Sequence, residues 1–147
     1  MKFEKIRNWR KGLQWVARLV LGGALLVAGI FKLIDDSALF ETVAYITWLP
    51  VWFKLLVVDL LPWAEIVLAL LLVTWRLDRW VRPPVIALYI VFLVFAIYGT
   101  VTGIEGDCGC FGELMNSTFG WPMILRNTLL LLLSFALYLP VSNRSSG

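Results

Sequence analysis

The sequence predicts an all-α integral membrane protein: a four-helix bundle with a short interfacial helix after the first span. Two observations support this. Of 147 residues, 61% are hydrophobic, and only 13 basic and 10 acidic residues carry charge. A soluble domain has about 25% charged residues, so this chain has too little polar surface to cover a core in water. Four apolar segments also approach the length of about 20 residues that a bilayer-crossing helix needs.

The predicted spans lie in four segments, at about residues 13–34, 51–75, 84–102 and 122–141. Unbroken apolar runs within them exclude the alternating pattern of a membrane β-barrel. Pro83, Pro84 and Pro122 suit the first positions of the third and fourth helices, where the missing N–H has no intrahelical partner. We expect one membrane domain over residues 1–144, followed by a tail at 145–147.

The segment between the first two spans predicts a short interfacial helix on the extracytoplasmic side, from Ser37 to Trp48. Ser37 is the expected cap of this helix, and Pro50 marks its end. The first span also carries small residues that favour close packing against a neighbouring helix. These are Gly22, Gly23 and Gly29.

The basic residues predict the orientation of the spans. They gather before the first span, between the second and third, and after the fourth, whereas the two other connections are acidic. The positive-inside rule therefore predicts cytoplasmic termini and an extracytoplasmic loop at 103–121. We expect a multi-pass protein of the bacterial inner membrane. Its net charge of +3 follows from the same asymmetry, so the lipid bilayer is an expected partner and nucleic acid is not.

The chain has only two cysteines, Cys108 and Cys110, and no histidine. Both cysteines fall in the loop that is predicted to face the oxidising side, where disulfides persist. Gly109 between them allows the backbone to bend, and a disulfide that closes so small a ring is strained and reactive toward thiolates. A redox-active pair, a structural disulfide, a thiolate metal site and two inert cysteines are the open interpretations. Arg126, near the outer end of the fourth span, favours a thiolate nearby.

Ionisable residues at membrane depth usually have a partner or a function. Glu65 lies inside the second span, and Asp59 lies closer to its outer end. Lys32, near the outer end of the first span, can pair with either acid if the two helices are adjacent. Such a pair either fixes helix packing or handles protons or a quinone beside a redox centre, and both interpretations remain open.

Taken together, these residues resemble the MauE branch of the DoxX-like membrane proteins. The matching motifs are the segments at residues 28–33 and 61–65, the run Cys-Gly-Cys-Phe-Gly at 108–112, and Arg126-Asn127. The resemblance implies a four-helix membrane bundle tied to thiol–disulfide chemistry outside the cytoplasm, often with a thioredoxin-like partner. The chain is also functionally similar to the DsbB and vitamin K epoxide reductase type of quinone-linked oxidoreductases. Those proteins use two cysteine pairs, whereas this chain has one.

The resulting hypothesis is an inner-membrane thiol–disulfide redox protein. Cys108 and Cys110 would exchange disulfides with a periplasmic thioredoxin-like or client protein, and a quinone is a possible electron acceptor. Arg126 would stabilise a thiolate or a bound acceptor, while Glu65 and Lys32 would tune the intramembrane environment. The alternatives are a non-enzymatic membrane assembly subunit and a copper-handling protein that uses both thiolates.

Overall fold

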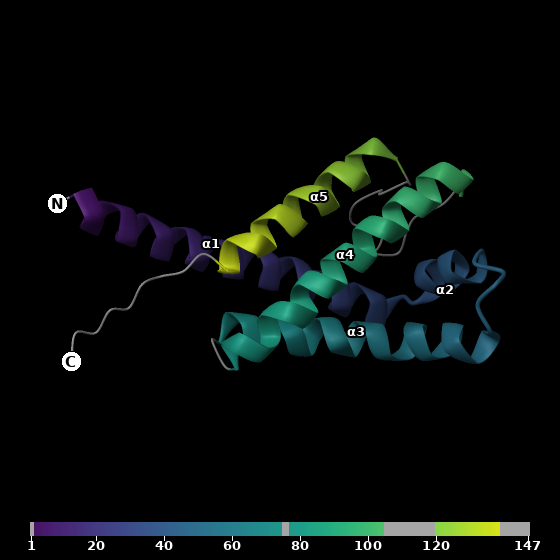
Figure 1. The fold of residues 1–147 in the computed structure, drawn as a ribbon. Helices are drawn as coiled ribbons and strands as arrows, with labels where there is room; N and C mark the ends of the chain where they lie inside the picture. Colours follow the sequence, from purple (N-terminus) through teal and green to yellow (C-terminus); the bar gives the residue numbers. More distant parts are fainter. Residues whose placement is uncertain (1, 75–76, 105–119, 139–147) are drawn as a thin grey trace.

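The computed structural model describes residues 2–74, 77–104 and 120–138. Within these ranges the chain is helical and contains no strand, which confirms the predicted fold class. The helices run up and down in chain order (Figure 1). They are α1 (Lys2–Ile34), α2 (Ser37–Ala44), α3 (Val51–Val73), α4 (Asp78–Thr102), α5 (Trp121–Phe135) and the 3₁₀ turn η1 (Ala136–Tyr138).

The bundle has two ends that differ in chemistry. At the end called here the basic end, α3 finishes, α4 begins at Asp78, and Arg18 of α1 lies against both. At the opposite end, called the loop end, α3 begins, α4 stops and α5 begins at Trp121, whereas α1 stops at Ile34, about halfway along α3. The loop end therefore holds both ends of the segment 105–119, which lies outside the described residues.

In the described part of the chain, four helical segments are long and apolar enough to cross a membrane. They are Glu4–Ile34, Val51–Val73, Asp78–Thr102 and Trp121–Tyr138. Their outward faces carry many exposed leucines, valines and isoleucines, as lipid contact requires. The chain is thus a multi-pass membrane protein. The first helix is longer than its predicted span because the charged residues before it are good helix formers.

Helices α1 and α3 pack closely, and two glycines make this possible. A Cβ on Gly29 would lie 2.9 Å from the Pro62 carbonyl oxygen and 3.3 Å from Glu65 Cβ. A Cβ on Gly22 would overlap the Val73 side chain. The predicted packing role is therefore confirmed for these two positions. The predicted packing role is wrong for Gly23. A Cβ at this position would have no atom within 4 Å, because Gly23 faces away from α3.

The short helix α2 is present but ends at Ala44 rather than at Trp48. Its predicted cap was wrong. Ser37 does not accept a cap hydrogen bond; its amide and hydroxyl donate to Asp35 Oδ1 at 3.0 and 2.5 Å. These hydrogen bonds lower the pKa of the Asp35 carboxyl, because they stabilise its ionised form. Asp35 thus satisfies the first amide of α2.

Helix α2 packs along the first half of α3. Leu39 and Val43 form a small apolar cluster with Val58. At the other end of α2, Lys54 Nζ donates to the Ala44 carbonyl oxygen at 3.2 Å, which satisfies one of the carbonyls that a helix leaves unpaired. Helix α2 is therefore held against α3 both by its apolar side and by its last carbonyl group. The location of α2 at the membrane interface stays a prediction.

Helix α4 begins at Asp78, six residues before the predicted start of the third span. Pro83 and Pro84 consequently lie inside its second turn rather than at its first position. The prediction failed because the start depends on Asp78, whose carboxylate binds two arginines and also lies at the favourable, N-terminal end of the helix dipole. Leu77, just before it, adopts a left-handed conformation with φ 54°.

The main core lies between α1, α3, α4 and η1. Leu21, Leu25, Leu72, Val85 and Leu137 are all buried within it. On α5, the buried residues recur at helical spacing and face inward: Met123, Asn127 and Ser134. Pro122 stands in the first turn of α5, as predicted. The helix itself ends at Phe135 and continues as η1 to Tyr138, and residues 139–141 of the predicted span lie outside the described residues.

Candidate functional site

The structure joins two of the predicted site residues, Lys32 and Glu65, in a buried ion pair between α1 and α3. Lys32 Nζ donates to Glu65 Oε1, and the two side chains are 1% and 0% exposed. Gly29, one turn before Lys32, lets the backbones approach so closely that the two side chains meet. The local sequence of both helices is apolar, so each charge depends on the other for stabilisation.

The pair lies near the middle of α3. Glu65 is 14 residues after Val51 and 8 residues before Val73, which corresponds to about 21 Å and 12 Å along the helix axis. Lys32 Nζ also lies 5.0 Å from the centre of the Phe92 ring, a cation–π contact with α4. The ion pair therefore ties three helices together at the centre of the bundle.

Tyr89 extends this polar layer toward the basic end. Its hydroxyl donates to the Leu21 carbonyl oxygen at 3.0 Å, and its ring meets Phe92 edge to face at 6.2 Å between centres. The other carboxylate oxygen, Glu65 Oε2, is buried and has no hydrogen-bond partner within the described ranges. The polar layer around Lys32 and Glu65 keeps two opposite charges within an apolar core, and its contacts fix the positions of α1, α3 and α4.

Asp59, the other acid considered for Lys32, does not join the pair. It lies on the exposed side of α3, whereas the buried side carries Val58, Pro62 and Glu65. The sequence placed both acids in the same span but could not distinguish their faces without knowing how α3 is rotated. Asp59 is therefore not part of the Lys32 site.

A second ionic cluster, at the basic end, was not predicted. Asp78 binds Arg18 through one carboxylate oxygen and Arg82 through the other. Arg18, 1% exposed, also donates to the Leu72 carbonyl oxygen at 3.2 Å. Arg82 lies 5.9 Å from the ring of Tyr138. The cluster connects α1, α3, α4 and η1. The signal that could have found it is an arginine inside the apolar part of a span.

Arg126 and Asn127 lie in the second turn of α5, close to the loop end. Arg126 is half-buried and has an interaction partner. Asn127 is 1% exposed, and neither atom of its side-chain amide has a hydrogen-bond partner among the residues that the structure describes. The sequence assigned a role to Arg126 only. Asn127 stood only in the matching motif Arg126-Asn127 and received no role, although a polar residue four positions after Met123 shares the inward face of the helix.

The predicted redox residues Cys108, Gly109 and Cys110 lie outside the described residues. The structure does describe both flanks of their segment. Helix α4 ends at Thr102, and the next residue, Gly103, caps it with a left-handed φ of 64°. Helix α5 begins 18 residues later at Trp121. The cysteine segment therefore joins two helices that pack against each other.

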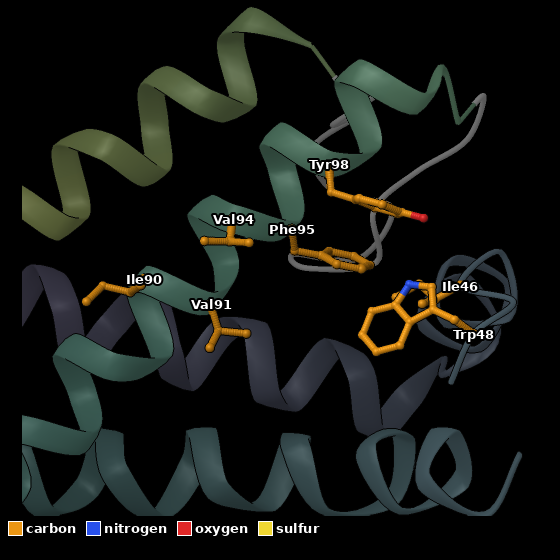
Figure 2. A pocket seen from close by; sticks show the side chains of 7 residues that line it. All are labelled: Ile46, Trp48, Ile90, Val91, Val94, Phe95 and Tyr98. Carbon is orange, nitrogen blue, oxygen red and sulfur yellow. The ribbon is translucent and has the colours of Figure 1, made fainter. Parts of the chain in front are cut away.

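An apolar groove of about 260 Å³ lies near the loop end (Figure 2). One wall is a face of α4 with Val91, Val94 and Phe95, and the other is the connection after α2 with Ile46 and Trp48. Ile90 and Tyr98 complete the lining. The groove offers no polar surface, so it suits a hydrocarbon chain rather than a polar ligand.

Comparison with known proteins identifies one family. Residues 10–140 match the family model described as methylamine utilisation protein MauE. No curated protein and no solved structure gave a significant match. The family match covers the first candidate span from residue 10 onward, the other three spans, the ion pair and the cysteine segment. The relationship to the wider DoxX-like proteins stays a prediction. The chain is a multi-pass membrane protein and belongs to the MauE family.

Proposed function

We propose that this protein exchanges disulfides with a thioredoxin-like or client protein on the extracytoplasmic side of the inner membrane, as a redox component of methylamine utilisation. The link to methylamine extends the family description to this chain. One observation carries the redox proposal: the only two cysteines stand one residue apart, at Cys108 and Cys110, between two membrane spans.

The chemistry of such a pair is a two-step exchange. A thiolate of the partner attacks one sulfur of the Cys108–Cys110 disulfide, so that a mixed disulfide forms and the other cysteine leaves as a thiolate. The second partner thiolate then attacks the mixed disulfide. The partner leaves oxidised, and Cys108 and Cys110 become a dithiol that has gained two electrons. The steps are reversible, and the two reduction potentials decide the direction.

The charge distribution supports an extracytoplasmic position for the pair. Arg18, Arg79 and Arg82 lie at or beside the basic end, and the acidic Asp35 and Asp36 lie between α1 and α2. The positive-inside rule makes the basic end cytoplasmic, so the loop end faces the oxidising compartment. Arg126 lies near this end, where its guanidinium would stabilise a thiolate or an anionic acceptor.

The groove and the ion pair have separate parts in the proposal. A quinone takes up two electrons and two protons when it reoxidises a dithiol, and its isoprenoid chain matches the apolar groove near Phe95. Lys32 and Glu65 would hold α3 in place against α1 and α4. Because the two charges bind each other in the bundle centre, we assign them positioning rather than a direct part in the exchange.

Trapping of mixed disulfides tests the proposal. Cells carry Cys108→Ser, Cys110→Ser or the double variant, and membranes are quenched with acid and alkylated. The expected result is a mixed disulfide to a thioredoxin-like or client protein in at least one single variant and none in the double variant. In the wild type, an alkylating reagent that cannot cross the membrane should label the pair only after reduction.

Two results would contradict the proposal. One is a wild-type pair that stays reduced in cells and traps no partner. The other is bound copper that is lost in both single variants, which would favour the copper-handling alternative. For the quinone, Val94→Trp fills the groove, and it should slow quinone-dependent reoxidation of the pair, whereas Leu129→Trp on the outward face of α5 is the matched control.

A further inference from the structure

The outward side of α3 combines a carboxylate with large apolar side chains. Residues three, four or seven positions apart lie on the same face of a helix. One such face of α3 is made of exposed residues from the first turn of the helix to its last. This surface, called the Asp59 face, consists of Trp52, Leu56, Asp59, Trp63 and Leu70. The same spacing forms the contact seam of paired helices in left-handed bundles.

Two members of this face are unusual for a surface that only contacts lipid. Asp59 is exposed within a span, whereas ionisable residues in spans almost always face the protein interior or pair with another group. Trp63 is 58% exposed, 12 residues from the start of α3 and 10 from its end. Tryptophans that face lipid gather at the two membrane interfaces, not at the middle of a span.

The two residues are one helical turn apart and so form a single recognition element. A carboxylate attracts a cation, and an indole ring binds a cation over its face. The attraction is strong at this depth because water does not screen it. In the described part of the chain, five basic residues inside the spans are already engaged: Arg18 and Arg82 with Asp78, Lys32 with Glu65, Lys54 with the Ala44 carbonyl, and Arg126 with a partner of its own.

We propose that the Asp59 face binds a membrane-spanning helix of another protein, and that a lysine or arginine of that helix inserts between Asp59 and Trp63. Leu56 and Leu70 pack against the apolar residues of the same helix. A second copy of this chain fits less well, because a two-fold contact centred on this face would bring the two Asp59 carboxylates together. The proposal is independent of the cysteines and of disulfide exchange.

Site-specific photo-crosslinking in native membranes tests the proposal. A photoreactive amino acid replaces Leu56 in the full-length chain, and the control position is Leu129, which is 57% exposed on α5. The expected result is a protein adduct from position 56 and only lipid adducts from position 129. Mass spectrometry of the adduct should identify an apolar segment that contains a lysine or arginine within about one turn of the crosslinked residue.

Variants of the recognition element then test the charge. Asp59→Asn and Trp63→Leu should each reduce the adduct yield from position 56 about tenfold, because each removes one contact with the basic side chain of the partner helix. Asp59→Glu keeps the charge and should leave the adduct yield unchanged. Because Asp59 and Trp63 are exposed, these variants should reach wild-type levels in the membrane. Lipid adducts alone, an adduct to a second copy of the chain, a partner segment without a basic residue, or an unchanged yield in Asp59→Asn would each overturn the proposal.

Discussion

Replacing Lys32 and Glu65, singly and together, tests the idea that the central ion pair positions the helices. The three variants are Lys32→Met, Glu65→Met and the double variant. Methionine is unbranched and apolar, and its flexibility lets it fill the space of either side chain. Each single variant therefore removes one charge and leaves the other in place, with little change in packing volume.

The expected magnitudes follow from the burial of the pair. Because the two side chains are 1% and 0% exposed, neither can reach water when its partner is removed. Leaving one member of a buried pair uncompensated costs about 3–5 kcal/mol of unfolding free energy. The double variant removes both desolvation penalties, and buried pairs replaced by apolar residues often lose no stability. We therefore expect the double variant to be more stable than either single variant.

Unfolding in mixed detergent micelles measures these free energies. Increasing amounts of a denaturing detergent unfold the protein, and the fluorescence of its eight tryptophans reports the transition. Asp59→Met is the matched control, since it removes an acid from the same helix at an exposed position. Its effect on the isolated protein should be within about 0.5 kcal/mol, as for most surface substitutions.

Two outcomes would refute the reasoning. Single variants within about 1 kcal/mol of the wild type would mean that the ion pair does not stabilise the packing of α1 against α3. A double variant whose loss equals the sum of the two single losses would mean that the residues act independently. A stable double variant that has lost disulfide exchange in cells would instead give the pair a role in the chemistry.

The glycine contacts predict a contrast: Gly29→Ala should cost about 1–3 kcal/mol because its Cβ would lie 2.9 Å from the Pro62 carbonyl, whereas Gly23→Ala should be neutral or stabilising. Equal midpoints of detergent unfolding for the two variants would contradict the close approach of α1 and α3. At the basic end, Arg18→Met should cost about 1–3 kcal/mol because it removes bonds to both Asp78 and Leu72; Arg82→Met should cost less, since Asp78 keeps Arg18, and the reverse order would refute the assignment. The pKa of Asp35 is lowered by hydrogen bonds from Ser37, so its stabilisation of the start of α2 is complete above the unfolded-state pKa and is lost as pH falls through the lower folded-state pKa. Hydrogen exchange of the Ser37 amide should therefore quicken, relative to its intrinsic rate, over that acidic range, and Asp35→Ala should abolish the pH dependence; a protection factor that stays constant through the range would disprove the contact.

The ends of the helices show which local signals were sufficient. Pro122 and Gly103 stand at a helix start and a helix end, where their backbone preferences put them. Pro83 and Pro84 misled the prediction, because Asp78 starts α4 earlier through contacts with two arginines, one of them 60 residues away in the sequence. A local preference thus fails where a distant partner decides the boundary.

The candidate site divides in the same way. Scarcity alone singled out Lys32, Glu65 and Asp59, since few charges occur inside the spans. The sequence could not show which acid meets Lys32. Neighbouring residues of a helix, such as the exposed Asp59 and the buried Val58, point about 100° apart, and only packing decides which of them faces inward. Asn127 was given no role for a similar reason: an amide gives no sign of burial until the inward face of α5 is known.

Composition and segment length alone establish that this chain is a helical membrane protein with four spans. The physical reason is that lipid offers no hydrogen bonds, so each long apolar segment must pair its own backbone groups within a helix. The tertiary structure decided which acid meets Lys32, which glycines form the contact with α3, and that Asp59 faces outward. These outcomes depend on how two helices are rotated and aligned, and the fit of Gly22 and Gly29 against residues more than thirty positions away sets that alignment.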